Sequence, residues 1–277
     1  IVIQILHDLV KLSMAQFEKN KNQNGYRLTF SGYDALSIHA LVGMGAIAEI
    51  GSKVGVGKES DIYIGLDNQR QRIILKFHRL GRNSFRRIKE KRDYLENRTH
   101  TSWLYSSRLA ATKEFKFMTV LKENGFPVPQ PLGHNRHCVV MSLIDGFTLN
   151  HVASFDDPSV QYDACRNLIV GLAESGLIHC DFNEFNLITD PEANIFMIDF
   201  PQLVSIDHPN ADWYFQRDLN CLKSYFQKRY QFSVDDDLKL CDIERKKHLD
   251  VEVSASGAKN HKSDLLSSDE EEKQSDL

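Results

Sequence analysis

The sequence predicts an α+β protein of two lobes, with a strand-rich lobe first, a helix-rich lobe after it and a cleft between them. Apolar residues alternate around a glycine turn in residues 52–66 and again in residues 72–78, which predicts strands. Helical periodicity dominates later, at residues 162–175 and 210–230, with strands of only two or three residues between. The chain has 277 residues, 42% of them hydrophobic, enough to bury the core of such a fold.

The first 44 residues predict a small module ahead of the main domain. Residues 5–19 have the apolar periodicity of a helix, residues 24–25 form a turn, residues 26–30 alternate like a strand, and a helix capped by Ser31 follows. This order matches the back half of a winged-helix domain, so residues 1–44 are interpreted as a partial winged helix. A small helical extension packed on the main domain is the alternative.

Residues 45–253 are predicted to form the main domain, with a first lobe over 45–141 and a second over 142–253. In the first lobe, a long amphipathic helix at residues 103–124 precedes a buried strand at 138–143. Residues 79–98 carry eight Lys or Arg against three acids and few large apolar residues, so we expect a mobile or partly helical basic insertion there.

The net charge of −4 is unevenly distributed. Residues 264–277 hold six acids and one lysine, or −5, which leaves +1 for the other 263 residues. From Ser254 onward the chain is polar and acidic, so residues 254–277 are expected to be disordered. No window reaches the ~18 apolar residues of a membrane span. The five cysteines show no C-x-x-C spacing, which favours a reducing compartment.

A glycine turn and a strand lysine suggest phosphate binding. Glycines such as Gly55 and Gly57 let backbone amides approach phosphates closely, although a plain hairpin turn is the alternative. The turn matches neither a Walker A loop nor a complete G-x-G-x-x-G, because Ser60 stands at the third glycine position. Lys76 lies in an apolar strand and needs an anion, for which Glu114 on the following helix is the candidate.

Residues 179–186 match H-x-D-x-x-x-x-N, the pattern of a kinase catalytic loop. Phosphoryl transfer needs an oriented acceptor and a metal that neutralises phosphate charge. Asp181 is predicted to orient the nucleophile, and Asn186 to hold Mg²⁺. Asp199 follows 18 residues after Asp181 and supplies a second oxygen ligand for this hard cation. Because the motifs occur in the right order, the sequence predicts an ATP-binding phosphotransferase.

The same residues resemble the RIO family of atypical kinases, and its second subfamily in particular. The matching runs are 55–63, 75–82, 91–94, 102–105, 179–188, 198–202, 208–211 and 249–257. The resemblance implies a winged helix before a two-lobed kinase domain, a short glycine loop, a flexible insertion before the glutamate helix, and no long activation segment. Cys180 departs from the glycine usual in the subfamily, and Ser142 from a glutamate; both roles are mainly backbone roles, so we expect tolerance.

The resemblance also implies an activity and a setting. Asp199 is expected to be phosphorylated transiently, with Asp181 preparing the reaction, during ATP-dependent maturation of the small ribosomal subunit. Expected partners are the pre-small-subunit particle, its rRNA and assembly factors, with no membrane partner, a monomeric state and a cytoplasmic location with passage through the nucleus. The residues expected to contact ATP are Gly55, Gly57, Lys58, Ser60, Lys76, Glu114 and, as an adenine-binding hinge, Met141, Ser142 and Ile144.

Two other functions remain open. The chain is alternatively a protein serine/threonine kinase with separate protein substrates, although the short segment after Asp199 argues against strong peptide recognition. It is alternatively an RNA-binding assembly module with a structural nucleotide, in which the basic residues 79–98 contact rRNA phosphates.

Overall fold

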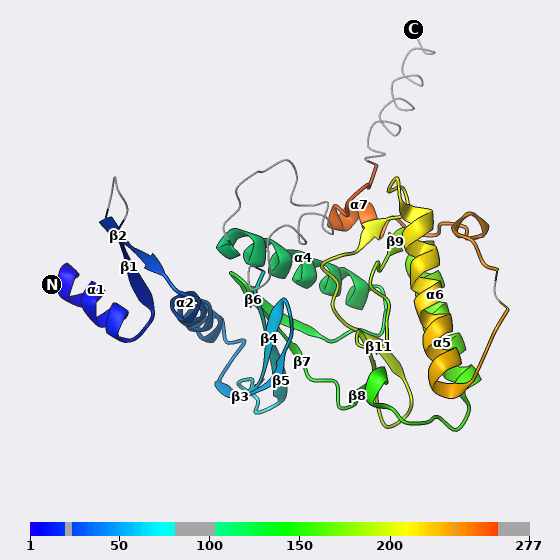
Figure 1. Ribbon diagram of the computed structural model, residues 1–277, viewed down its shortest axis with the longest axis horizontal. Helices are drawn as coiled ribbons and strands as arrows, with labels where there is room; N and C mark the ends of the chain where they lie inside the picture. Colours follow the sequence, from blue (N-terminus) through cyan, green and yellow to red (C-terminus); the bar gives the residue numbers. More distant parts are fainter. Residues whose placement is uncertain (20–23, 81–102, 236, 260–277) are drawn as a thin grey trace, which may run out of the picture. The chain divides into compact units, whose positions relative to one another are not determined.

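The computed structural model describes residues 1–19, 24–80, 103–235 and 237–259, and its contacts divide the chain into two compact units (Figure 1). The first unit comprises residues 1–123 and 128–144, and the second comprises residues 124–127 and the chain from 145 onward. The predicted two-lobed α+β organisation is therefore confirmed, with the division after residue 144 instead of 141. No helix of the described residues is long and apolar enough to cross a bilayer.

The N-terminal module consists of α1 (Val2–Lys11), β1 (Ala15–Lys19), β2 (Asn24–Leu28) and α2 (Phe30–Gly43). The helix predicted over residues 5–19 is wrong beyond Lys11: Ser13 adopts a left-handed φ of 57°, and the chain turns into β1. Phe17, expected on the helix, lies on β1 with its ring 5.1 Å from that of Tyr26. The cap of α2 is Thr29 instead of Ser31, because its hydroxyl accepts the Gly32 amide.

Five antiparallel strands form the sheet of the first unit, in the order β3-β4-β5-β7-β6. They are β3 (Glu49–Val56), β4 (Ser60–Leu66), β5 (Arg72–His78), β6 (Pro131–Asn135) and β7 (Cys138–Ser142). Helix α4 (Trp103–Glu123) packs on β5, β6 and β7. Leu41 of α2 belongs to the same core as Leu75 of β5, so residues 1–44 form part of this unit and not a separate body.

The second unit is built around α5 (Pro158–Glu174) and α6 (Ala211–Tyr230), which lie side by side (Figure 1). Tyr162 of α5 and Phe226 of α6 pack edge to face at 5.5 Å in its core. Two small sheets accompany the helices. One has three strands, β8 (Phe147–Thr148), β10 (Leu187–Thr189) and β11 (Ile195–Met197), and the other pairs β9 (Leu177–Ile178) with β12 (Val204–Ser205). The 3-10 helices η2 (Leu149–His151) and η3 (Leu240–Asp242) and helix α7 (Leu249–Val253) complete the unit.

The packed chain continues beyond Ser254, where disorder was expected to begin. Ala255 is buried, and the Ser205 amide donates to the carbonyl of Ser256 at 2.9 Å. Residues 254–259 therefore belong to the second unit. Residues 260–277 and most of the predicted basic insertion, from 81 to 98, lie outside the described residues.

Candidate active site

Lys76 and Glu114 form a buried ion pair in the first unit. The ammonium of Lys76 lies 2.6 Å from Oε1 of Glu114, and the two residues are 8% and 1% exposed. Their predicted pairing is confirmed. Nε2 of His78 lies 2.6 Å from the second carboxylate oxygen, so Glu114 holds both side chains. The sequence analysis missed His78, although residues 76 and 78 must share one face of a strand.

The glycine turn connects β3 and β4 of the same unit. The Gly57 amide donates to the Ser60 carbonyl at 2.8 Å, and Lys58 is exposed at the tip. Neither Gly55 nor Gly57 has a positive φ, and a Cβ built on either meets only ordinary contacts, at 3.5 Å and 3.4 Å. The fold itself therefore does not require glycine at these positions.

The predicted hinge residues lie at the end of β7, between β5 and β6. Met141 is buried, and the Ser142 amide donates to Gln130 at 2.9 Å. The Ile144 amide follows the strand and has no acceptor within the described part of the chain. Of the expected hinge amides, that of Ile144 is therefore available to a ligand, whereas that of Ser142 is not.

Asp181 and Asn186 are brought together in the second unit. Nδ2 of Asn186 donates to the Asp181 carbonyl at 2.9 Å and to Oδ2 of its carboxylate at 3.0 Å. Oδ1 accepts from Nδ2 of Asn183, also at 3.0 Å. Two side-chain amides thus fix the Asp181 carboxylate, and the amide nitrogen of Asn186 is committed to it.

The hairpin β10–β11 places Asp199 near Asn186. The Ile198 amide donates to the Asn186 carbonyl at 3.0 Å, so the two predicted metal ligands flank one end of this hairpin. Asp199 is half-buried and has a left-handed φ of 70°. Such strained backbone is stable only where its surroundings enforce it, and it is frequent at active sites.

His179 lies among these carboxylates. Burial lowers the pKa of the imidazole, while the negative charges of Asp181 and Asp199 oppose that shift. The ring packs edge to face on Phe182 and Phe200. A neutral, buried ring between two acids fits the structural role predicted for His179.

Two neighbouring residues of α6 hold the loop that carries Asp181. Asp218 accepts the Cys180 amide at 2.8 Å and the Phe182 amide at 3.2 Å, and the Arg217 guanidinium donates to the Cys180 carbonyl. Burial raises the pKa of Asp218 to about 7, against the effect of the two amides. The sequence analysis missed both residues; an aspartate amid the apolar positions of a helix is the only signal for Asp218.

Cys180 adopts a left-handed φ of 65°. This conformation suits glycine, the residue that the resemblance places here, because a Cβ adds steric strain. Cysteine is therefore tolerated at this position only at the cost of backbone strain. The loop accommodates a small side chain, and the Asp218 and Arg217 hydrogen bonds hold the strained peptide in place.

The donor set fits magnesium. Because Nδ2 of Asn186 faces Asp181, its Oδ1 is left as an oxygen donor, and Asp199 adds a carboxylate. Among the described residues, no three His, Cys, Asp or Glu side chains gather into a preformed metal cage. Mg²⁺ is commonly bound by one or two protein ligands, with waters and phosphate oxygens completing the octahedron.

Two features together define a protein-kinase-type fold. One is a buried Lys–Glu pair on a five-stranded sheet, and the other is an H-x-D-x-x-x-x-N loop that is followed by a further aspartate. The RIO domain family model matches residues 61–238. A serine/threonine-protein kinase RIO2 of Caenorhabditis elegans is 50% identical over 92% of this chain and 48% of its own length. The corresponding rio2 of Schizosaccharomyces pombe is 49% identical over 84% of this chain and 68% of its own length.

The structural comparison agrees. A Rio2 kinase from Chaetomium thermophilum, solved as an ADP/Mg²⁺-phosphoaspartate complex, matches with a TM-score of 0.81 and 42% identity, over 100% of this chain and 86% of that one. The chain therefore belongs to the RIO family, in its Rio2 branch. It spans about half the length of the Caenorhabditis and Dictyostelium relatives, 48% of each.

Proposed function

We propose that this chain transfers the γ-phosphoryl group of ATP to the carboxylate of Asp199, in a Mg²⁺-dependent reaction, and that the acyl-phosphate is then hydrolysed. One observation carries the proposal: Asp199 is held in a left-handed conformation directly after Ile198, whose amide donates to Asn186, the residue that holds the Asp181 carboxylate. The phosphoaspartate in the Chaetomium relative supports an aspartate as the acceptor.

The step balances without a further reactant. A carboxylate oxygen of Asp199 forms a bond to the γ-phosphorus while the bond from that phosphorus to the bridging oxygen breaks, and ADP leaves. In the second step, a water oxygen forms a bond to the phosphorus of the acyl-phosphate while the bond from that phosphorus to the Asp199 oxygen breaks, so inorganic phosphate leaves and the carboxylate is restored. Asp181, oriented by Asn183 and Asn186, accepts the proton of the water. Mg²⁺ bound through Asn186 and Asp199 would neutralise the phosphate charge.

The first unit supplies the groups for phosphate and adenine. Lys76, positioned by Glu114, brings a cation to the phosphates. Gly55 and Gly57 are not required by the fold, which is consistent with a backbone kept bare for close approach of a ligand. The Ile144 amide offers a hydrogen bond to the adenine edge.

We also propose the setting that the family resemblance implies. The phosphorylation cycle would serve late maturation of the small ribosomal subunit in the cytoplasm, with the pre-small-subunit particle, its rRNA and assembly factors as partners. The 50% identity to a Rio2 relative across most of the chain supports the family membership on which this setting rests.

The test is label transfer from [γ-³²P]ATP with Mg²⁺, comparing the wild type with Asp199→Ala and Asp181→Ala. We expect label that hydroxylamine releases and that Asp199→Ala lacks, because acyl-phosphates are labile to hydroxylamine. Stable label on serine or threonine would instead support a protein kinase. ATP binding without label or hydrolysis would contradict the proposal and favour the RNA-binding module.

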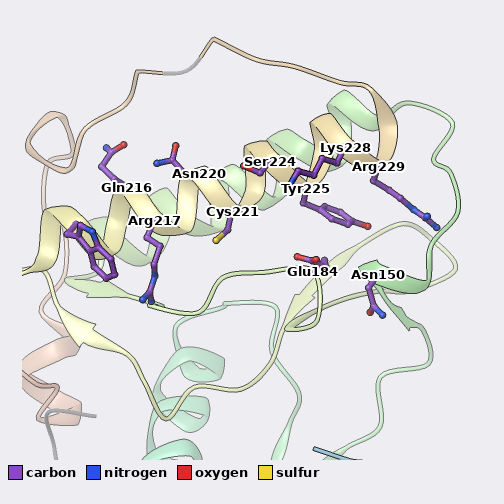
Figure 2. A pocket seen from close by; sticks show the side chains of 11 residues that line it. Asn150, Glu184, Gln216, Arg217, Asn220, Cys221, Ser224, Tyr225, Lys228 and Arg229 are labelled. Carbon is purple, nitrogen blue, oxygen red and sulfur yellow. The ribbon is translucent and has the colours of Figure 1, made fainter. Parts of the chain in front are cut away.

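A groove beside the catalytic loop favours a second function, phosphorylation of a separate protein. Figure 2 shows Cys221 and Tyr225 of α6 on the side of the helix where Glu184 and Asn150 lie, and the cavity measures about 710 Å³. Arg217, Lys228 and Arg229 line it, against the single acid Glu184. This charge suits an acidic acceptor peptide.

That function has its own test. A serine peptide flanked by acidic residues should be phosphorylated in proportion to enzyme, and Lys228→Glu should raise its KM without changing Asp199 labelling. Equal turnover of acidic and basic peptides, or none of either, would exclude the groove as an acceptor site.

A further inference from the structure

Strand β5 presents two chemically different faces, and only one of them belongs to the site described above. Lys76 and His78 point to Glu114 of α4. The alternate residues Phe77 and Arg79, the second just beyond the end of the strand, are directed to the opposite side, as the two-residue period of a strand requires. Arg79 lies there in a buried network that the proposed reaction does not use.

Arg79 joins three parts of the first unit. Its Nη1 and Nη2 form a bidentate pair with Asp34 of α2 at 2.6 and 2.7 Å, and its Nε donates to Asp61 of β4 at 2.9 Å. Only 4% of Arg79 is exposed, and its guanidinium lies over the rings of Phe30 and Phe77. Bidentate arginine–carboxylate pairs fix orientation as well as charge.

The backbone of Arg79 holds the glycine turn. Its amide donates to the Glu59 carbonyl at 2.6 Å, at the point where the turn re-enters β4. Asp61, two residues further on, pairs with Val56, the last residue of β3. The amide and side chain of Arg79 thus hold Glu59 and Asp61, which follow Gly57 where the turn enters β4, and Asp61 in turn pairs with the end of β3.

These hydrogen bonds of Arg79 depend on α2, which lies outside the sheet. A buried guanidinium is stable only with its charge compensated, and Asp34 supplies the two-point partner. The other groups facing the network are His137, whose Nε2 lies 2.7 Å from Asp34, and Lys53, 3.6 Å from Asp61. Neither replaces a carboxylate: imidazole brings no negative charge, and Lys53 competes for Asp61.

We infer that Arg79 is a positioning residue for nucleotide binding, and that α2, through Asp34, is part of the apparatus that sets the glycine turn. The inference rests on the proposed function of that turn in phosphate binding. Loss of the Asp34 charge should release Arg79 and leave the turn mobile, which weakens ATP binding although Asp34 touches no nucleotide.

The test compares Asp34→Asn with Ser37→Ala. Ser37 lies one turn further along α2 and also ties it to the sheet, but its hydroxyl donates to the Asn135 carbonyl of β6 at 2.7 Å instead of to the Arg79 network. Binding of ADP with Mg²⁺ is measured by calorimetry well below each melting temperature, alongside KM and kcat. We expect Asp34→Asn to weaken binding about tenfold, with Ser37→Ala within about twofold, at comparable losses of melting temperature.

Arg79→Lys is a second test variant, because lysine keeps the positive charge of arginine but cannot form its bidentate pair with a carboxylate. It should weaken nucleotide binding as Asp34→Asn does, and combining the two changes should add little. Equal weakening by Ser37→Ala, or unchanged affinity in Asp34→Asn and Arg79→Lys, would overturn the inference. If the wild type nevertheless carries a label that hydroxylamine releases, the proposed function still holds and only the inference about Arg79 fails.

Discussion

The carboxylate of Asp218 accepts a 2.8 Å hydrogen bond from the amide of Cys180, so a residue of α6 fixes the peptide immediately before the proposed catalytic Asp181. The Asp218 side chain is 1% exposed, and its second oxygen holds the Phe182 amide. A rigid helix therefore sets the conformation of a loop that has little secondary structure of its own. The position of Asp181 then depends on a buried charge.

This buried carboxyl should make stability pH-dependent. The pKa of Asp218 rises from 3.8 to about 7 on folding, so the folded state holds the proton more tightly between these values. Its contribution to the free energy of unfolding should fall as pH rises from about 4 to about 7, by roughly 1.4 kcal/mol per pH unit at most, and stay level above that. The difference in urea stability between wild type and Asp218→Asn, measured from pH 5 to 8, should show this slope. A difference independent of pH would contradict it.

Cys180 should tolerate a smaller side chain and reject a β-branched one. Its left-handed φ costs a residue with a Cβ about 1 kcal/mol, which glycine avoids, while glycine loses the buried thiol and gains unfolded-state entropy. Cys180→Gly should therefore stay within about 1 kcal/mol of wild type. Cys180→Val should lose more than about 2 kcal/mol, because valine strongly disfavours this conformation. Thermal melts check both; equal stability of the two variants would exclude backbone strain at this site.

Glu114 should matter more for stability than either of its partners. Glu114→Ala removes the carboxylate that accepts from Lys76 and lies 2.6 Å from Nε2 of His78 inside the protein, and should cost about 3 kcal/mol. Lys76→Met leaves His78 to pair with the carboxylate and should cost less. Urea unfolding, carried out at a temperature below the thermal melting range, measures the free energy of unfolding of both variants. A larger loss of stability for Lys76→Met than for Glu114→Ala would show that His78 does not compensate the Glu114 carboxylate.

Asn186 and Asn183 both bond Asp181, yet only Asn186 is a proposed metal ligand. Asn186→Ala should raise the Mg²⁺ concentration for half-maximal ATP turnover by tenfold or more, on the order of losses seen when metal-site contacts are removed. Asn183→Ala should lower kcat by loosening Asp181 and leave the Mg²⁺ dependence unchanged. Parallel Mg²⁺ titrations of the two variants separate the roles; an equal shift in both would argue against Asn186 as a ligand.

Local patterns predicted the elements with long, regular periodicity. The helix at 103–124 and the strand at 72–78 agree with α4 and β5 to within a residue, because each shows several repeats of one period. The helix predicted over residues 5–19 was wrong beyond Lys11 because a left-handed Ser13 interrupts it, and single-residue turns leave little trace in apolar periodicity. The Lys76–Glu114 pair was predictable, since a lysine within an apolar strand needs an anion on the element that packs over it.

The order of chemical groups could be predicted from the amino-acid sequence: a glycine turn, a strand lysine, a helix glutamate, and the Asp181, Asn186 and Asp199 set. These follow from residue type and spacing, which the chain carries locally. Only the tertiary structure decided what supports them: His78 as a second partner of Glu114, Asp218 beneath the catalytic loop, and Arg79 between α2 and the glycine turn. Each joins elements distant in the sequence, and a buried charge finds its partner only when packing has excluded water from both.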